Sequence, residues 1–150
     1  MKSLRELYKI GRGPSSSHTM GPMRAAQIFL SEHRDAASFQ VTLYGSLAAT
    51  GKGHMTDAAI IDELRPVAPV EIVWKPSVFL PFHPNGMNFK SLDADKNVTG
   101  DWTVYSVGGG ALSEGKANGD RFDTSSNVYD LERLSDIQTW CEDKGRSYWE

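Results

Sequence analysis

The fold is decided by the segment Phe39-Gln40-Val41-Thr42-Leu43-Tyr44-Gly45-Ser46-Leu47-Ala48-Ala49-Thr50. Residues 39–44 alternate in polarity and are rich in residues that favour strands, so they predict a half-buried β-strand that leads into a helix over 45–50. A second step of this kind follows, since Thr56-Asp57 can cap a helix to Leu64 and residues 70–74 predict another strand. Strands that alternate with helices in this way indicate a layered sheet.

Two helices are predicted before this segment. Ser3 and Glu6 have the spacing of a capping box and predict a short opening helix. A longer helix is predicted from Thr19 to about Arg34, with Gly21-Pro22 in its first turn, where proline is tolerated. Its apolar residues recur at steps of three and four: Met23, Ala26, Phe29 and Leu30.

The second half of the chain predicts antiparallel strands between residues 80 and 107, with a turn at Pro84-Asn85-Gly86. A mobile loop is predicted over 113–127, followed by a helix that opens at Asp130 and ends near Gly145. Together these elements predict an α+β fold in which a mixed sheet packs against helices as a two-layer sandwich. Residues 1–150 are expected to form a single domain.

The composition excludes several classes of function. The 16 Lys and Arg against 19 Asp and Glu give a net charge of −3 with no basic block, which argues against a nucleic-acid partner. Because no apolar run approaches the roughly 18 residues of a membrane span and no signal peptide is evident, no membrane partner and a cytoplasmic location are expected. The single cysteine, Cys141, cannot by itself hold a cluster or a zinc ion, so no metal site is predicted in this chain.

A candidate site begins at the hinge Gly13-Pro14, which leads into Ser15-Ser16-Ser17-His18-Thr19. This run comes at the start of the predicted helix, where free N–H groups and the helix dipole favour an anion. The hydroxyl groups could bind a carboxylate, or they could simply cap the helix. Both interpretations are open at this point.

Three segments combine glycine with histidine: Gly13 to His18, Gly51-Lys52-Gly53-His54 and His83-Pro84-Asn85-Gly86. Imidazole suits proton transfer near neutral pH, and glycine lets the backbone approach a small ligand. Lys52 could balance a bound carboxylate, although it could equally be a surface lysine. These features indicate a small anionic metabolite without naming a reaction.

These motifs strongly resemble those of the β domain of iron–sulfur-dependent L-serine dehydratase. The resemblance rests on segments that occur in order over most of the chain: Gly13–Thr19 with Gly21-Pro22-Met23, Leu43–Ala48, Thr50–His54 with Thr56-Asp57, and His83–Met87. That domain is in turn similar in fold to the allosteric substrate-binding domain of some phosphoglycerate dehydrogenases.

The resemblance implies conversion of L-serine to pyruvate and ammonia with a 4Fe-4S cluster held by cysteines of a separate α domain or subunit. With this resemblance, His54 and His18 are the expected catalytic residues, and His54 is expected to be the base or to lie nearest to it. His18 with Ser16, Ser17 and Thr19 is expected to hold the substrate carboxylate or the leaving hydroxyl. Ser15, Lys52, His83 and Asn85 are further substrate-binding candidates. Because the cluster cysteines are absent, the chain is expected to be a subunit or an excised fragment, inactive alone and able to form a homodimer.

Two other interpretations compete with this one. The chain could be a non-catalytic module whose glycine loops bind serine or a related hydroxy acid as an effector. It could also be a metal-free scaffold that only dimerises. The histidines in glycine loops favour proton transfer, because binding alone does not require them.

Overall fold

The computed structural model describes residues 10–11, 15–116, 122 and 130–148. These residues belong to two compact units, one within residues 9–123 and one that contains residues 130–148. The opening helix predicted from Ser3 lies outside the described residues.

The larger unit is built on a five-stranded mixed sheet with the order β2-β1-β3-β4-β5. Strand β1 runs parallel to β2 and antiparallel to β3, and the β3–β4 and β4–β5 pairs are antiparallel. This arrangement confirms the predicted α+β fold. The strands are β1 (Ser38–Tyr44), β2 (Val70–Lys75), β3 (Gly86–Leu92), β4 (Val98–Gly108) and β5 (Ala111–Ser113).

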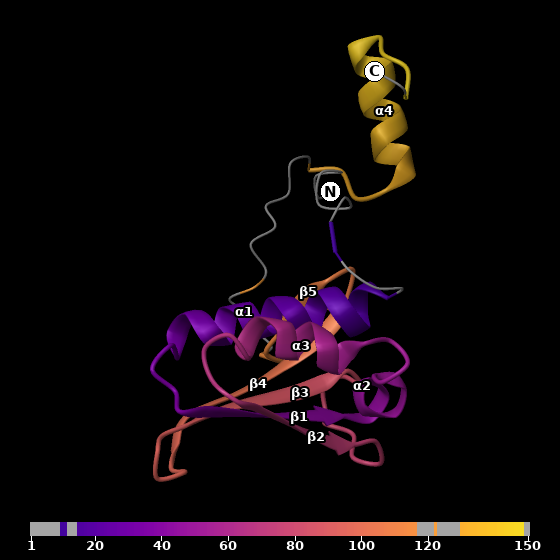
Figure 1. Ribbon diagram of the computed structural model, residues 1–150. Helices are drawn as coiled ribbons and strands as arrows, with labels where there is room; N and C mark the ends of the chain where they lie inside the picture. The colour runs from indigo at the N-terminus through magenta and orange to yellow at the C-terminus, as the bar shows by residue number, and fades with distance from the viewer. Residues whose placement is uncertain (1–9, 12–14, 117–121, 123–129, 149–150) are drawn as a thin grey trace. The chain divides into compact units, whose positions relative to one another are not determined.

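The two longest helices of the larger unit lie side by side over one face of the sheet (Figure 1). They are α1 (Gly21–Glu32), where the apolar periodicity predicts a helix from Thr19 to about Arg34, and α3 (Thr56–Leu64), which is predicted from Thr56-Asp57. A single π-helical turn, η2 (Ser16–Met20), precedes α1, and the short helix α2 (Gly45–Thr50) follows β1 directly. Because η2 and α2 both contact the same end of the sheet, the loops that carry the predicted site residues converge there.

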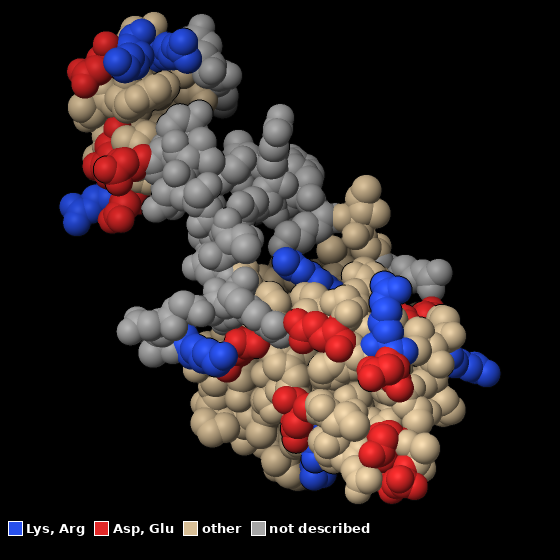
Figure 2. Space-filling view, turned by 90° about the vertical axis from the view of Figure 1, so that its left-hand side faces the viewer, with Lys and Arg blue, Asp and Glu red and all other residues tan. Residues whose placement is uncertain are grey.

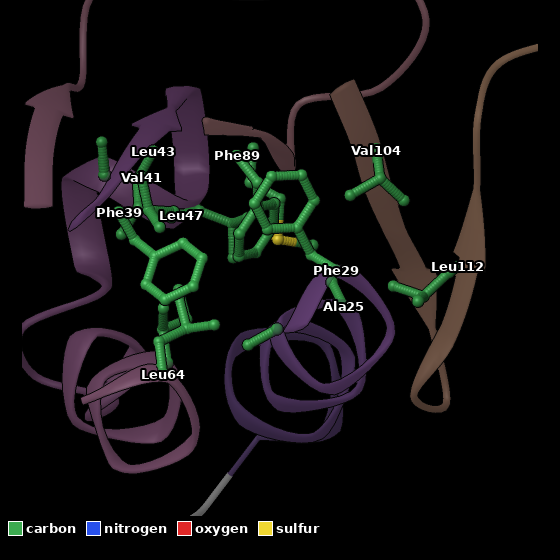
Figure 3. Packing of buried hydrophobic residues seen from close by; sticks show 14 of the residues in the cluster. Ala25, Phe29, Phe39, Val41, Leu43, Leu47, Leu64, Phe89, Val104 and Leu112 are labelled. Carbon is green, nitrogen blue, oxygen red and sulfur yellow. The ribbon is translucent and has the colours of Figure 1, made fainter. Parts of the chain in front are cut away.

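The core lies between the sheet and the helices, with Phe29 of α1 at its centre (Figure 3). The Phe29 ring stacks on Trp102 at a centroid distance of 6.3 Å and packs against Phe89 at 5.5 Å. Strand β1 was predicted to be half-buried, and this is wrong. Five of its seven residues are buried, because β1 is a central strand that has a neighbour on each side and helices above it.

Two predicted helix starts differ from the structure. The hydroxyl of Thr56 does not cap α3: Met55 is the N-cap residue, in the left-handed region with φ 59°, and the Thr56 hydroxyl is buried without a hydrogen bond. In the smaller unit, the last helix is α4 (Leu134–Lys144), which begins four residues later than the predicted Asp130. The reason is a capping box between Arg133 and Asp136, while Gly145 ends the helix as predicted.

The loop after β2 is hydrogen-bonded to the first turn of α2. Gly45 N–H donates to Val78 O at 2.9 Å, and Ser46 N–H donates to Pro84 O at 3.0 Å. Gly45 has φ +48°, and a Cβ there would lie 2.6 Å from Pro84 O. Glycine is therefore required where β1 passes into α2, and this turn fixes the loop that contains His83 next to Ser46.

The described surface of the larger unit carries both acidic and basic side chains (Figure 2). On the face seen in Figure 2, acidic and basic side chains are interspersed and do not gather into a patch of one sign. Among the described helices, none has the length and apolar character needed to cross a bilayer.

Candidate functional site

His18 lies where three segments of the chain meet. Its Nδ1 atom lies 3.0 Å from Ser17 Oγ and 3.3 Å from Ser15 Oγ, both beside it at the start of η2. Its Nε2 atom lies 3.4 Å from Ser46 Oγ in the first turn of α2. Hydroxyl groups therefore flank both nitrogens of the imidazole, and each hydroxyl can donate or accept as the ring requires.

His54 comes from the turn between α2 and α3 and faces His18. The two ring centroids are 4.8 Å apart, and the rings are inclined by 35°. His54 Nδ1 lies 2.9 Å from the carbonyl oxygen of Thr50. Because a carbonyl oxygen only accepts, Nδ1 must carry the proton, and in the neutral ring Nε2 then has a free lone pair that can accept a proton.

The surroundings of His18 lower the pKa of its imidazole from the usual 6.5. Burial is the largest cause, because it disfavours the charged ring, and the nearby His54 imidazole adds repulsion. A hydrogen bond with the backbone of Ser46 acts in the opposite direction. His18 is therefore held in its neutral form near neutral pH, with one nitrogen that donates and one that accepts.

Three of the other candidates lie apart from the pair of imidazoles or are already engaged. Ser16 is exposed to solvent. Thr19 is only 2 % exposed, and its hydroxyl donates to the carbonyl of Ser15. The Lys52 ammonium lies 5.5 Å from the centre of the Trp74 ring, a cation–π contact with β2. The structure thus brings together Ser15, Ser17, His18 and His54 from the predicted set.

His83 and Asn85 lie on the loop that is hydrogen-bonded to Ser46. His83 Nδ1 accepts a hydrogen bond from Asn85 N–H at 3.1 Å. The Asn85 side-chain amide donates to Ser106 O at 3.2 Å, and Asn85 is 9 % exposed. Asn85 thus joins the start of β3 to β4, while His83 keeps Nε2 for other partners.

Ser46 was not among the predicted site residues. It follows Gly45 at the end of a buried strand, which is the position where a side chain can reach the loops at the edge of the sheet. The run Tyr44-Gly45-Ser46 carries a signal for such a position, but the sequence pattern predicts only that Ser46 lies in a helix. Its contact with His18 joins residues 28 positions apart and is not visible in any local pattern.

A cavity of about 560 Å³ lies between η2, α1 and α3. Its lining includes Thr19, Met23, Asp62 and Glu63. Neither His18 nor His54 lines it. Its two carboxylates would repel an anionic ligand, so the pair of imidazoles is the better candidate for binding and proton transfer.

The described residues do not form a site for a metal or an iron–sulfur cluster. Within residues 10–11, 15–116, 122 and 130–148, no group of three or more His, Cys, Asp or Glu side chains could hold a metal ion. Cys141, the single cysteine of the chain, is buried in the smaller unit.

The mixed sheet, the hydroxyl-lined turn before α1 and the facing imidazoles define an α+β domain with a candidate site for a small polar metabolite. The profile of the serine dehydratase beta chain family matches residues 3–75 and 63–117, which together span most of the sequence. The chain belongs to this family.

Curated relatives support this assignment. The L-serine dehydratase of Haemophilus influenzae is 30% identical over 186 residues, and L-serine dehydratase TdcG of Escherichia coli is 34% identical over 189 residues. These matches cover 97% and 98% of this chain but 41% of each relative. The chain thus spans well under half the length of these relatives. The alignments are also longer than the 150 residues of the chain, so each relative contains at least 36 residues without a counterpart here.

Proposed function

We propose that this chain supplies the substrate-binding and acid–base part of an L-serine dehydratase that converts L-serine to pyruvate and ammonia. The observation that carries the proposal is the pair His18 and His54, whose ring centroids lie 4.8 Å apart. His54 binds Thr50 O through Nδ1, which leaves Nε2 to accept a proton, and His18 is flanked by hydroxyl groups. Membership of the serine dehydratase beta chain family and the names of the curated relatives support it.

In the proposed reaction, His54 Nε2 removes the proton from Cα of serine. The electron pair forms the Cα–Cβ double bond while the β-hydroxyl leaves, and the resulting aminoacrylate is hydrolysed to pyruvate and ammonia. Since Nδ1 of His54 is fixed by Thr50 O, the ring presents its basic nitrogen without further rearrangement. His18, held by Ser15, Ser17 and Ser46, would hydrogen-bond the serine carboxylate or the leaving hydroxyl.

The proposal includes a partner. A 4Fe-4S cluster, as the resemblance implies, would be bound by a cluster-bearing α domain or subunit, because the described residues do not form such a site. When bound there, the cluster would supply a Lewis acid to the substrate. We expect the assembled protein to act in the cytoplasm and the chain alone to be inactive.

A second candidate function is a regulatory module that binds serine or a hydroxy acid as an effector. The observation that favours it is the hydroxyl cluster of Ser15, Ser17 and Ser46, which could hold a carboxylate without any proton transfer. The two functions differ in what they require of His54, because an effector site has no need for a base.

The decisive experiment replaces His54 in the assembled enzyme and follows pyruvate release anaerobically. Removal of a general base should lower turnover by about 10²- to 10⁴-fold in His54→Ala. The matched control is His33→Gln, since His33 lies beside Phe29 and away from the site. Near-normal turnover of His54→Ala with retained serine binding, measured by calorimetry with D-serine as the control ligand, would instead identify an effector module.

A further inference from the structure

Strand β2 forms an open edge of the sheet. It pairs with β1 along one side, and no described strand lies along its other side. The Phe39 N–H donates to Pro69 O at 2.8 Å. The backbone N–H and C=O groups of successive strand residues point to opposite sides, so those of Glu71, Val73 and Lys75, like those of Pro69, point toward β1. Those of Val70, Ile72 and Trp74 therefore turn outward, where they can pair with another strand.

The side chains along this edge are incompletely covered. Val70, Ile72 and Trp74 pack against the core but remain only partly buried, whereas Val41 and Leu43 of β1 are fully buried. Strand β2 has no bulge and no inward-pointing charge, and the two charged residues of the strand, Glu71 and Lys75, are exposed. The prolines at 69 and 76 limit the length of the strand rather than block its centre.

The β2 region also lies where the match to the family profile is divided in two. The two segments matched by the family profile overlap at residues 63–75, which run from the end of α3 through β2. The relatives also contain at least 36 residues without a counterpart in this chain. Among the described strands, none covers the partly buried apolar side chains and the outward backbone groups of β2.

The sequence of β2 is complementary to itself in one antiparallel register. If two copies pair about a twofold axis at Val73, Glu71 of each copy lies opposite Lys75 of the other, and Ile72 lies opposite Trp74. The outward backbone groups of Ile72 and Trp74 then form the hydrogen-bonded pairs. Glu71 and Lys75 occupy the non-hydrogen-bonded positions, where opposed side chains are closest. If the twofold axis passed through Ile72 or Trp74 instead of Val73, Glu71 and Lys75 would no longer lie opposite each other, and neither charge pair would form.

We infer that two copies of this chain associate through antiparallel pairing of their β2 strands, centred on Val73, into a continuous ten-stranded sheet. The helix layers of both copies then lie on the same side, because residues opposite one another in this register point to the same face. Ile72 of each copy packs on Trp74 of the other and covers the apolar edge. This inference does not depend on the proposed enzymatic function.

Sedimentation analysis of the full chain over about 1 µM to 1 mM tests the pairing through a charge exchange. Glu71→Lys and Lys75→Glu each turn two attractive pairs into two repulsive ones and should raise the dimer dissociation constant about tenfold or more. The double variant restores both pairs with reversed sign and should return the constant to within about threefold of the original. Asp95→Lys, on the turn between β3 and β4, makes a matched charge change elsewhere and should leave it unchanged.

Amide hydrogen exchange supplies an independent readout. The N–H groups of Ile72 and Trp74 should exchange more slowly as the protein concentration rises, while Val73 N–H, already turned toward β1, should change little. A wild-type chain that is monomeric at about 1 mM would overturn the inference. So would a dimer that tolerates both single substitutions, or one that the double variant fails to restore.

Discussion

The imidazole rings of His18 and His54 lie 4.8 Å apart between centroids, although the residues are 36 positions apart in the chain. Each ring is held through its Nδ1 atom: that of His54 lies beside Thr50 O, and that of His18 lies beside the hydroxyls of Ser15 and Ser17. His54 therefore influences the protonation of His18, and this effect can be measured directly.

We predict that the pKa of His18 lies below 6.5 and rises in His54→Ala. Burial is the main cause of the lowered pKa and persists in the variant, whereas the repulsion from His54 is lost. The pKa should thus move toward 6.5 without reaching it. NMR titration of the imidazole carbon-bound protons measures both values, and an unchanged His18 pKa in the variant would refute the coupling.

The stability of the larger unit should fall on acidification through the titration range of His18. Because the folded-state pKa is lower than the unfolded value near 6.5, the unfolded chain binds more protons between the two values. The free energy of unfolding therefore decreases as the pH falls through 6.5 toward the folded pKa. Thermal melts from neutral to acidic pH should show a weaker decline in His18→Gln, and parallel declines would exclude His18 as the source.

Ser17 is predicted to orient the His18 ring, and Ser16 is not. Ser17 Oγ lies 3.0 Å from His18 Nδ1, while the adjacent Ser16 is exposed and makes no described contact with the ring. Ser17→Ala should therefore shift the ¹⁵N resonances of the His18 ring and alter its tautomer balance. Ser16→Ala is the matched control. Equal shifts in the two variants would mean that the hydroxyl contact does not set the ring's state.

Gly21 is predicted to be essential for docking α1 on the sheet. A Cβ at this position would lie 2.2 Å from Ser106 Oγ and 2.9 Å from Ser106 Cβ, so Gly21→Ala should lower the free energy of unfolding by about 1–3 kcal/mol. Chemical denaturation measures the loss. Adding Ser106→Gly should recover part of it, and Ser106→Ala alone should be nearly neutral because the hydroxyl is buried without a hydrogen bond. Additive effects of Gly21→Ala and Ser106→Gly would disprove the clash.

The strands and helices of the larger unit could be predicted because their signals are local. The apolar periodicity of α1 and the strand propensity of residues 39–44 and 70–74 each identify an element within one short window. Short β5 was missed, since a strand of three residues has too little sequence to show a pattern. It is created by Gly109 and Gly110, whose φ values of 58° and 71° form a two-residue turn that brings the chain back along β4.

The candidate site was predictable in part. The histidines in glycine loops marked His18 and His54, and the structure brings these two together. The sequence could not show that the Thr19 hydroxyl donates a hydrogen bond to Ser15 O, or that the Ser46 hydroxyl contacts His18. The first contact depends on the backbone conformation of the η2 turn. The second depends on how η2 and α2 lie in space, which the spacing of 28 residues does not predict.

Asn85 gives the sharpest contrast between a binding role and a structural one. The sequence predicts that it binds substrate, but in the structure its amide donates to Ser106 O, and Ser106 N–H in turn donates to Asn85 O at 3.0 Å. Because Asn85 is nearly buried, Asn85→Ala should lower the free energy of unfolding by about 1–3 kcal/mol. It should leave the KM for L-serine of the assembled enzyme unchanged, as measured by pyruvate release. A raised KM with unaltered stability would instead show that the amide is released from Ser106 to contact the substrate.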